Sequence, residues 1–206
     1  HAKLQRFKDN IPALRVIKEN RQGACFARNT GMEIAEGDYI QFLDADDLLF
    51  PEKISIQIAL LSALFDELPA VIVGDCYRED VFKIKKTILS EKNDIWFGLL
   101  TTRLGNTCSN LWKKKELQHI GGWNTAYHSS QEYELLFRIL KQGARIVFDD
   151  SLNTVVRDRE DGISISSENK RQNWMTYCDL RGEIIKYIID KNINPSLIQK
   201  YYQVMF

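Results

Sequence analysis

The sequence predicts an α/β fold, a mixed sheet flanked by helices. Short apolar segments with the composition of strands alternate with amphipathic stretches of helical periodicity, an order typical of sheets covered by helices. The expected strands are residues 39–43, 70–77, 144–150 and 153–157. The first of these is followed at once by three carboxylates, Asp44, Asp46 and Asp47. The carboxyl end of a strand is where open α/β sheets bind ligands, so this position is the first candidate site.

Composition and charge narrow the class of protein. The 206 residues are 44% apolar and 27% charged, which suits one globular core, and the formal net charge is zero, which gives no basic field for nucleic acid. Apolar runs such as IALLSALF are far shorter than the roughly 18 residues of a membrane-spanning helix. The four cysteines form no paired motif, which fits reduced thiols in a cytosol. We therefore expect a cytoplasmic protein.

The first third of the chain predicts a helix, a strand and a second helix after an incomplete start. Residues 4–7 resemble a helix end, and the segment from Pro12 through LRVIKEN predicts a turn into a strand, half of a βαβ unit. Gly23 is expected to open a helix and Gly37 to close it in a left-handed conformation. The helix after the acidic cluster is expected to begin at Pro51. Its predicted apolar face consists of Ile54, Ile58, Leu61, Leu64 and Phe65.

The middle of the chain is less regular. Residues 78–93 are charged and irregular, which predicts a mobile or edge region after the strand at 70–77. The pattern of residues 95–110 is ambiguous, and a short helix is expected to end at the Gly121–Gly122 pair. The next helix, residues 131–143, has an amphipathic pattern, and Ser129 or Ser130 is positioned to cap its start. Its predicted apolar positions are Leu135, Leu136, Ile139 and Leu140.

The remainder from about Asn169 predicts helices. Their apolar positions include Trp174, Tyr177, Ile184, Ile185, Tyr187 and Ile188. We expect two units: a core over residues 1–166 and a C-terminal helical extension, residues 167–206, packed on it. The extension also mixes aromatic side chains with Lys and Arg, so it is a candidate for peripheral contact with a membrane surface, while a packed helical cap explains it equally well.

The acidic cluster predicts a metal site. Asp44 and Asp46 lie two residues apart, which in an extended strand places both side chains on one face. Hard cations such as Mg²⁺ take oxygen ligands and commonly share their site with phosphate oxygens, so a phosphate-bearing substrate is indicated. The alternative is an acidic turn that ends the strand and caps the helix at Pro51.

A longer segment around this cluster resembles a known family. The match is long and ungapped: NRQGACFARNTGMEIAEGDYIQFLDADD. It resembles the signature of family 2 glycosyltransferases of the GT-A fold. The resemblance implies that Asp44 and Asp46 bind Mg²⁺ or Mn²⁺ on the diphosphate of a nucleotide-sugar, with Asp46 as the more direct metal ligand. It also implies a GT-A, Rossmann-like arrangement of the sheet.

A second segment, HIGGWNTAYHSSQEYELLFRILKQGA, is similar to another part of the same family pattern. The family's general base is an aspartate in a dipeptide that opens a helix, and Glu132 occupies that position with one extra methylene group. A base is required because a sugar hydroxyl is a weak nucleophile until its proton is removed. The resemblance further implies direct displacement, with inversion of the anomeric centre.

Other candidates are weaker. The resemblance places Arg157 or Arg159 near the diphosphate, where a guanidinium clamps phosphate. A helix-borne Arg28 is expected to brace the carboxylates, and Trp123 suits either a wall for an acceptor sugar or the core. His128 has no partner at metal-ligand spacing, so we do not assign it. Glu134 and Arg138 are interpreted as an exposed ion pair on one helix face.

The resemblance covers about Val16 to Ser166, and the family's first strand and helix have no counterpart in this chain. It implies an inverting, metal-dependent glycosyltransferase of bacterial surface polysaccharide synthesis, at the inner face of the membrane or free in the cytoplasm. The expected donor is a nucleotide-sugar, with UDP-sugars first, and the expected acceptor is a saccharide or a lipid-linked saccharide. Two rivals are a catalytically silent relative that binds nucleotide-sugar or polysaccharide, and a nucleotidyltransferase. The second lacks a glycine-rich phosphate-binding start.

Overall fold

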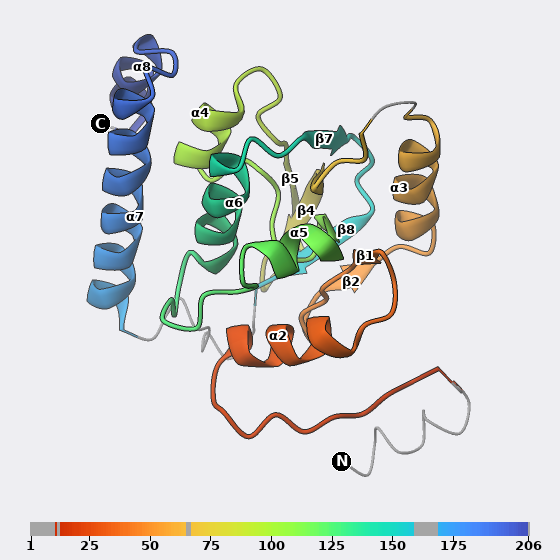
Figure 1. Ribbon diagram of the computed structural model, residues 1–206. Coiled ribbons are helices and arrows are strands. Elements are labelled where there is room, and N and C mark those ends of the chain that lie inside the picture. The colour runs from red at the N-terminus through yellow and green to blue at the C-terminus, as the bar shows by residue number, and fades with distance from the viewer. Residues whose placement is uncertain (1–10, 12, 65–66, 159–168, 206) are drawn as a thin grey trace.

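The computed structural model describes residues 11, 13–64, 67–158 and 169–205 and contains two mixed sheets with helices around them (Figure 1). The first sheet has the order β1-β6-β3-β7 and the second the order β2-β8-β4-β5. The strands are β1 (Tyr39–Ile40), β2 (Leu48–Leu49), β3 (Val71–Gly74), β4 (Cys76–Glu79), β5 (Lys85–Ile88), β6 (Leu111–Lys113), β7 (Ile146–Asp149) and β8 (Thr154–Arg157). The predicted α/β class is confirmed.

The helices lie on both sides of the first sheet. They are α2 (Ala24–Ile34), α3 (Lys53–Ser62), α4 (Ile95–Leu100), α5 (Lys114–His119), α6 (Gln131–Lys141), α7 (Lys170–Asp190) and α8 (Ser196–Met205). Figure 1 shows α3 on one side of the sheet and α4 and α6 on the other, with α7 and α8 forming an outer layer beyond them.

The two sheets are connected, because a strand of the first sheet is followed directly in the chain by a strand of the second. The expected strand at 70–77 divides at Asp75 into β3 of the first sheet and β4 of the second. Both pairings at this point are parallel: β3 pairs with β7, and β4 pairs with β8. The Asp75 N–H donates to the Asp149 carbonyl at 3.1 Å. This bond lies where the chain passes from the first sheet to the second. The irregular region 78–93 contains the edge strand β5.

The main core lies between the first sheet and the helices α4, α6, α7 and α8. The apolar face predicted for α6 is buried, and Asp94 caps α4 by accepting from the Phe97 N–H at 3.0 Å. Side chains of both C-terminal helices belong to the same core: Leu180, Ile184, Ile188, Leu197 and Tyr201. Of the helices in the described part of the chain, none is long and apolar enough to cross a membrane.

The predicted apolar face of α3 is confirmed at Leu61 and Leu64, which pack in a small core cluster, and wrong at Ile54 and Ile58. Ile54 and Ile58 are 39% and 43% exposed, whereas Lys53 and Gln57 are buried together with Leu61. The reason is a buried polar network, since the Lys53 Nζ donates to the side-chain oxygens of Gln41 at 2.8 Å and Gln57 at 2.5 Å. Polar satisfaction therefore sets the rotation of this helix. Phe65 lies outside the described residues.

Several expected boundaries also differ. Residues 13–20 form no strand, and the expected strand 39–43 is reduced to β1. Helix α2 does begin after Gly23, but it ends at Ile34 with an extended Ala35, so Gly37 supplies no left-handed cap. Ser130 precedes α6 in a left-handed conformation with φ 54° and makes no side-chain cap. The helix end expected at residues 4–7 and the turn at Pro12 lie outside the described residues.

Candidate active site

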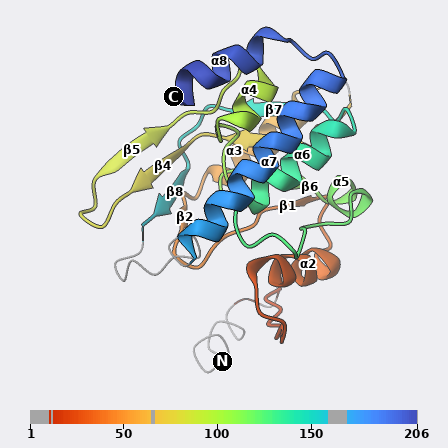
Figure 2. The same cartoon turned by 90° about the vertical axis from the view of Figure 1, so that its left-hand side faces the viewer.

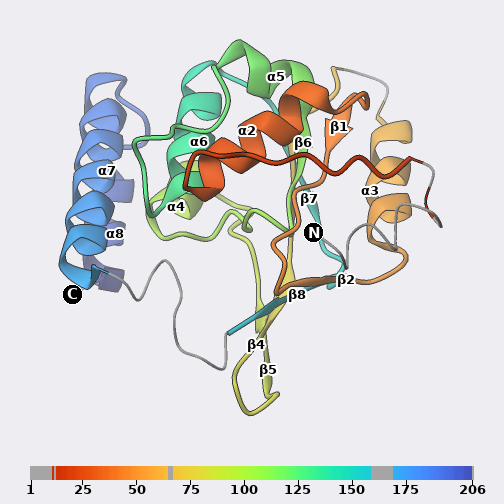
Figure 3. The same ribbon diagram turned by 90° about the horizontal axis from the view of Figure 1, so that it is seen from below.

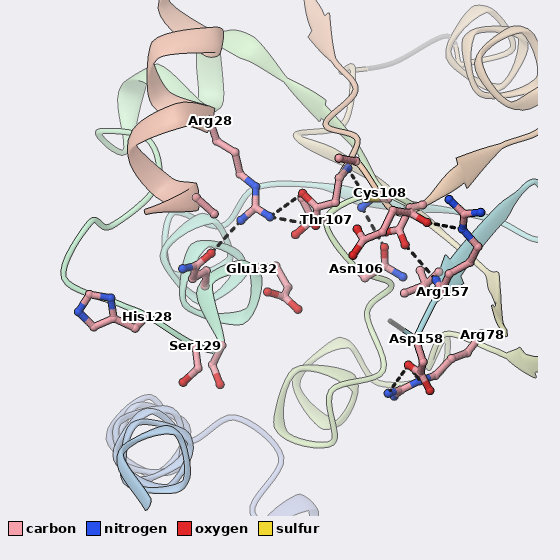
Figure 4. Close-up of a pocket in the computed structure, with 18 residues that line it drawn as sticks. Arg28, Arg78, Asn106, Thr107, Cys108, His128, Ser129, Glu132, Arg157 and Asp158 are labelled. Atoms are coloured by element: carbon pink, nitrogen blue, oxygen red, sulfur yellow. Dashed lines mark hydrogen bonds and ion pairs between the residues drawn. The ribbon is translucent and has the colours of Figure 1, made fainter. Parts of the chain in front are cut away.

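One cleft of about 1020 Å³ collects the candidate residues from distant parts of the chain. Its walls come from the start of α2, the acidic loop between β1 and β2, the loop 106–108, the segment 128–132 and the end of β8. The cleft is lined by Arg28, Asp44, Asp46, Asp47, Cys108, Glu132 and Arg157, among others. The four main site residues predicted from the sequence, Asp44, Asp46, Glu132 and Arg157, therefore line one cleft. Figure 4 labels Glu132 and Arg157 among the residues around it.

The acidic loop presents Asp44 and Asp47 together with Cys108. One ligand atom from each of the three lies within 4.8 Å of the others. The loop closes as a tight turn, in which the Asp47 N–H donates to the Asp44 carbonyl at 3.1 Å, and Asp46 falls outside this group of three. Burial raises the pKa of Asp47, although hydrogen bonds from Cys108 and the Arg157 backbone oppose the rise. The sequence places Asp47 in the acidic cluster, but it does not show that Cys108 lies beside it.

Asp46 is held from the other side of the cleft. The Arg157 Nε donates to the Asp46 carbonyl, and the Arg157 backbone N–H donates to Asp47 Oδ1 at 3.0 Å. These two bonds fasten the acidic loop to β8 and leave the Asp46 carboxylate free of any role in the turn itself. Asp158, directly after the end of β8, pairs with Arg78 of β4 at 2.9 Å. Arg159 lies outside the described residues.

Arg28 connects the two halves of the cleft. Its Nη2 donates to both carboxylate oxygens of Asp44 at 2.9 and 3.1 Å, and its Nη1 donates to Gln131 Oε1 at 2.8 Å. The guanidinium lies 4.6 Å from the ring centre of Trp123, which supports it by a cation–π contact. Figure 4 shows these bonds reaching from α2 toward both walls. The bracing role expected for Arg28 agrees with this geometry.

Trp123 belongs to the core and is not a wall of the cleft. Its side chain is 1% exposed and packs edge-on against Phe42 with ring centres 5.2 Å apart. Asn29 fixes the Trp123 backbone by accepting from its N–H and donating to its carbonyl, both at 2.8 Å. Of the two readings of this residue, core packing is therefore the one that the structure supports.

Glu132 is the second residue of α6, and its side chain is partly buried in the cleft. Burial raises the pKa of its carboxyl, and the charge of Asp44 adds to the rise while Arg28 opposes it. In Figure 4 the Glu132 carboxylate lies in the space between Arg28 and the loop of Asn106 and Cys108. A carboxyl group whose pKa is raised takes up a proton more readily than an exposed one, which suits a group that accepts a proton.

A buried polar network supports the floor of the cleft. Asn106 Oδ1 accepts from the backbone N–H groups of Cys108 and Ser109, both at 2.9 Å. Gln41 donates to the Cys108 carbonyl at 2.7 Å, and Gln41 is itself held by Lys53. Because burial outweighs nearby charges, the pKa of Lys53 is lowered to about 8. The network fixes the loop against which the acidic residues lie.

The structure also places the Glu134–Arg138 ion pair and His128. Glu134 pairs with Arg138 at 2.7 Å as expected, but the pair is buried and not exposed, because Glu134 is 6% exposed. Arg138 also donates to the carbonyls of Ile120 and Gly122, so the pair fastens α6 to the preceding turn. His128 lines the cleft without entering the carboxylate group.

The donor set of the cleft suits a hard divalent cation. The carboxylates of Asp44 and Asp47 lie close together on one tight turn and provide oxygen ligands of the kind that Mg²⁺ and Mn²⁺ prefer, while Asp46 lines the same cleft outside this group. Cys108 is a poor metal ligand here, because burial and the nearby charge of Asp44 raise the pKa of its thiol. Its sulfur accepts from the Asp44 N–H at 3.2 Å and thereby supports the loop.

Comparison with known proteins identifies the class. The model of the Glycosyl transferase family 2 matches residues 1–132, and the chain belongs to this family. The fold agrees with it. TarS 1-349 of S. aureus covers 76% of this chain at 16% identity with a TM-score of 0.57, over 47% of that chain. The mannosyltransferase PcManGT from Pyrobaculum calidifontis, in complex with GDP-Man and Mn²⁺, covers 76% at 18% identity with a TM-score of 0.53, over 43% of that chain.

Curated relatives also carry glycosyltransferase names. An uncharacterized glycosyltransferase of Rickettsia felis is 29% identical over 80% of this chain, and this match spans 29% of that protein. An Escherichia coli protein named UDP-Glc:alpha-D-GlcNAc-diphosphoundecaprenol beta-1,3-glucosyltransferase WfaP is 30% identical over 72% of this chain and 57% of its own length. The chain thus spans under two thirds of these relatives. The comparisons support a glycosyltransferase of the GT-A type.

Proposed function

We propose that this chain is the catalytic part of an inverting, metal-dependent glycosyltransferase that moves a sugar from a nucleotide-sugar to a hydroxyl group. The observation that carries the proposal is the single cleft that joins the acidic loop to Glu132, although the two segments are far apart in the sequence. A nucleotide diphosphate requires cationic partners at one end of such a cleft, and an attacking hydroxyl requires a base at the other.

The residues divide this work. Asp44, Asp46 and Asp47 would hold Mg²⁺ or Mn²⁺, which when bound offsets the charge on the departing diphosphate. Arg157 lies at the same end, tied to the acidic loop, where its remaining guanidinium N–H groups suit a phosphate oxygen. Glu132 accepts the proton of the acceptor hydroxyl as its oxygen bonds to the anomeric carbon. The bond from that carbon to the diphosphate oxygen breaks, and the nucleoside diphosphate leaves.

The donor and acceptor are proposed by class. The named E. coli relative uses UDP-Glc and a diphosphoundecaprenol-linked acceptor. We extend to this chain a UDP-sugar as donor, a saccharide or lipid-linked saccharide as acceptor, and a place in bacterial surface polysaccharide synthesis. A cytoplasmic enzyme working at the inner face of the membrane suits such an acceptor.

Two substitutions in the full-length protein test the division of labour. Asp46→Ala is expected to abolish transfer and to weaken metal-dependent binding of the nucleoside diphosphate. Glu132→Gln is expected to abolish transfer while nucleotide binding is preserved, because the base acts on the acceptor. Nucleotide binding is measured by calorimetry with Mn²⁺, and transfer by release of nucleoside diphosphate.

Matched controls are available on α2 and its neighbouring loop. Asp38→Ala and Glu33→Gln change exposed carboxylates that do not line the cleft, and both should leave transfer intact. Near-normal turnover in Glu132→Gln overturns the assignment of the base. If the unsubstituted protein binds nucleotide but yields no product with any donor, the alternative of a silent binding relative replaces the enzyme.

A further inference from the structure

The hairpin of β4 and β5 extends from the body of the protein on the side of the cleft. Figures 2 and 3 both show it projecting beyond the other elements. Among the strands that the structure describes, β5 pairs only with β4 and forms the edge of its sheet. Residues 81–89, here called the hairpin tip, are exposed without interruption, and all four residues of β5 are exposed. A strand exposed on both faces is covered by no layer of the fold.

The chemistry of this tip is unusual for an exposed segment. Five of its residues are large apolar side chains, and Phe82 is 80% exposed. The five are Val81, Phe82, Ile84, Ile88 and Leu89. The other residues are Lys83, Lys85, Lys86 and Thr87, so the tip contains three cations and no acidic residue. Large exposed apolar groups of this kind mark interaction surfaces.

The acidic residues beside the tip are engaged in its own structure. Asp80 Oδ1 accepts from the backbone N–H groups of Phe82 and Ile84, both at 2.9 Å, which shapes the turn. Glu79 forms loose pairs with Lys83 at 3.7 Å and Lys85 at 3.8 Å, and its side chain is 13% exposed. The surface that points outward is therefore apolar and cationic, the combination that binds an interface of acyl chains and anionic headgroups.

We propose that the hairpin tip docks this protein on an anionic lipid bilayer. Phe82 and Ile84 enter the headgroup boundary while Lys85 and Lys86 contact lipid phosphates. The tip is joined directly to the cleft, because Arg78 of β4 and Asp158, the residue after β8, line the cleft and pair with each other. Docking then holds the cleft beside the bilayer, where a lipid-linked acceptor is anchored. This last consequence rests on the proposed function, whereas the docking does not.

Vesicle binding tests the docking without any substrate. The full-length protein is floated with phosphatidylglycerol vesicles and, separately, with phosphatidylcholine vesicles. Binding is expected to the anionic vesicles and to weaken with salt. Phe82→Ser and the double variant Lys85→Gln/Lys86→Gln should each reduce the bound fraction at least fivefold. Trp174→Ser is the matched control, because Trp174 is a 64% exposed aromatic residue on α7, and it should leave binding unchanged.

A spectroscopic variant keeps the result independent of stability. Phe82→Trp should show a blue-shifted emission and quenching by brominated lipid when anionic vesicles are added. Loss of binding in Trp174→Ser with full binding in Phe82→Ser would overturn the proposal in favour of α7. Self-association of the unsubstituted protein that Phe82→Ser abolishes, without vesicle binding, would overturn it in favour of strand pairing through β5. A catalytically silent protein that still binds vesicles would leave the docking intact and reject only the proposed function.

Discussion

At the scale of single residues, the candidate site is organised around the guanidinium of Arg28. It holds Asp44 on one wall and Gln131, the neighbour of Glu132, on the other. The two nitrogens that make these bonds, Nη1 and Nη2, belong to one planar fork, which a lysine lacks. Through this residue the position of the acidic loop and the position of α6 depend on each other, so the two ends of the cleft are held at a defined separation.

The raised pKa of Glu132 predicts how kcat/KM falls on the acid side of its pH profile. The proposed base works only when ionised, and burial raises the pKa of this carboxyl above its usual 4.5. The value of kcat/KM should therefore rise with pH through a limb centred above 4.5, falling about tenfold per pH unit below it. Measurement at saturating metal across the acidic and neutral range checks this. A midpoint of the acid limb at or below pH 4.5 contradicts the prediction. As a control, Glu33→Asp should leave the pH profile of kcat/KM unchanged.

Residue identities in the site were predictable where a motif named them. Asp44, Asp46 and Glu132 follow from the two segments that resemble the family, and the cleft brings them together. The association of Cys108 with Asp44 was not predictable, because it depends on a loop 64 positions away whose shape is set by Asn106. A lone cysteine in a sequence carries no signal of such a contact.

At the scale of elements, the positions of helices and strands were more predictable than their faces. The pattern of α6 was sufficient because its apolar stripe lies in the main hydrophobic core. The pattern of α3 failed because Lys53 and Gln57 find buried amide partners, so the stripe of Ile54 and Ile58 is left exposed. Periodicity assumes that polar side chains face water, and a satisfied buried network breaks that assumption.

The turn between α5 and α6 provides a test at this scale. Gly121 and Gly122 both have positive φ values, 80° and 71°, so an alanine at either position should cost about 1 kcal/mol of stability. A Cβ at Gly121 meets nothing within 4 Å, whereas a Cβ at Gly122 would lie 2.6 Å from Asn29 Oδ1. Gly122→Ala should therefore cost a further 1–2 kcal/mol or so by disturbing the Asn29–Trp123 bonds. Urea unfolding compares the two, and equal losses would contradict this account.

At the scale of the whole molecule, the C-terminal helices are part of the main core. Ile184 of α7 is fully buried, so Ile184→Ala should lower the free energy of unfolding by about 2–5 kcal/mol. Ile189 on the same helix is 61% exposed, and Ile189→Ala should change it by less than about 0.5 kcal/mol. Thermal unfolding with circular dichroism should show one transition in both variants. A separate early transition in Ile184→Ala would indicate an extension that unfolds by itself.

The shared core also determines when this chain can fold. Leu197 and Tyr201 of α8 pack in the same core as Cys25 and Met32 of α2, so its contacts join residues near both ends of the described chain. Contacts of such long sequence separation slow folding, because the intervening chain must be ordered before they form. During synthesis, the apolar faces of α4 and α6 stay uncovered until α7 and α8 have left the ribosome. Apolar surface exposed in that interval is prone to aggregation.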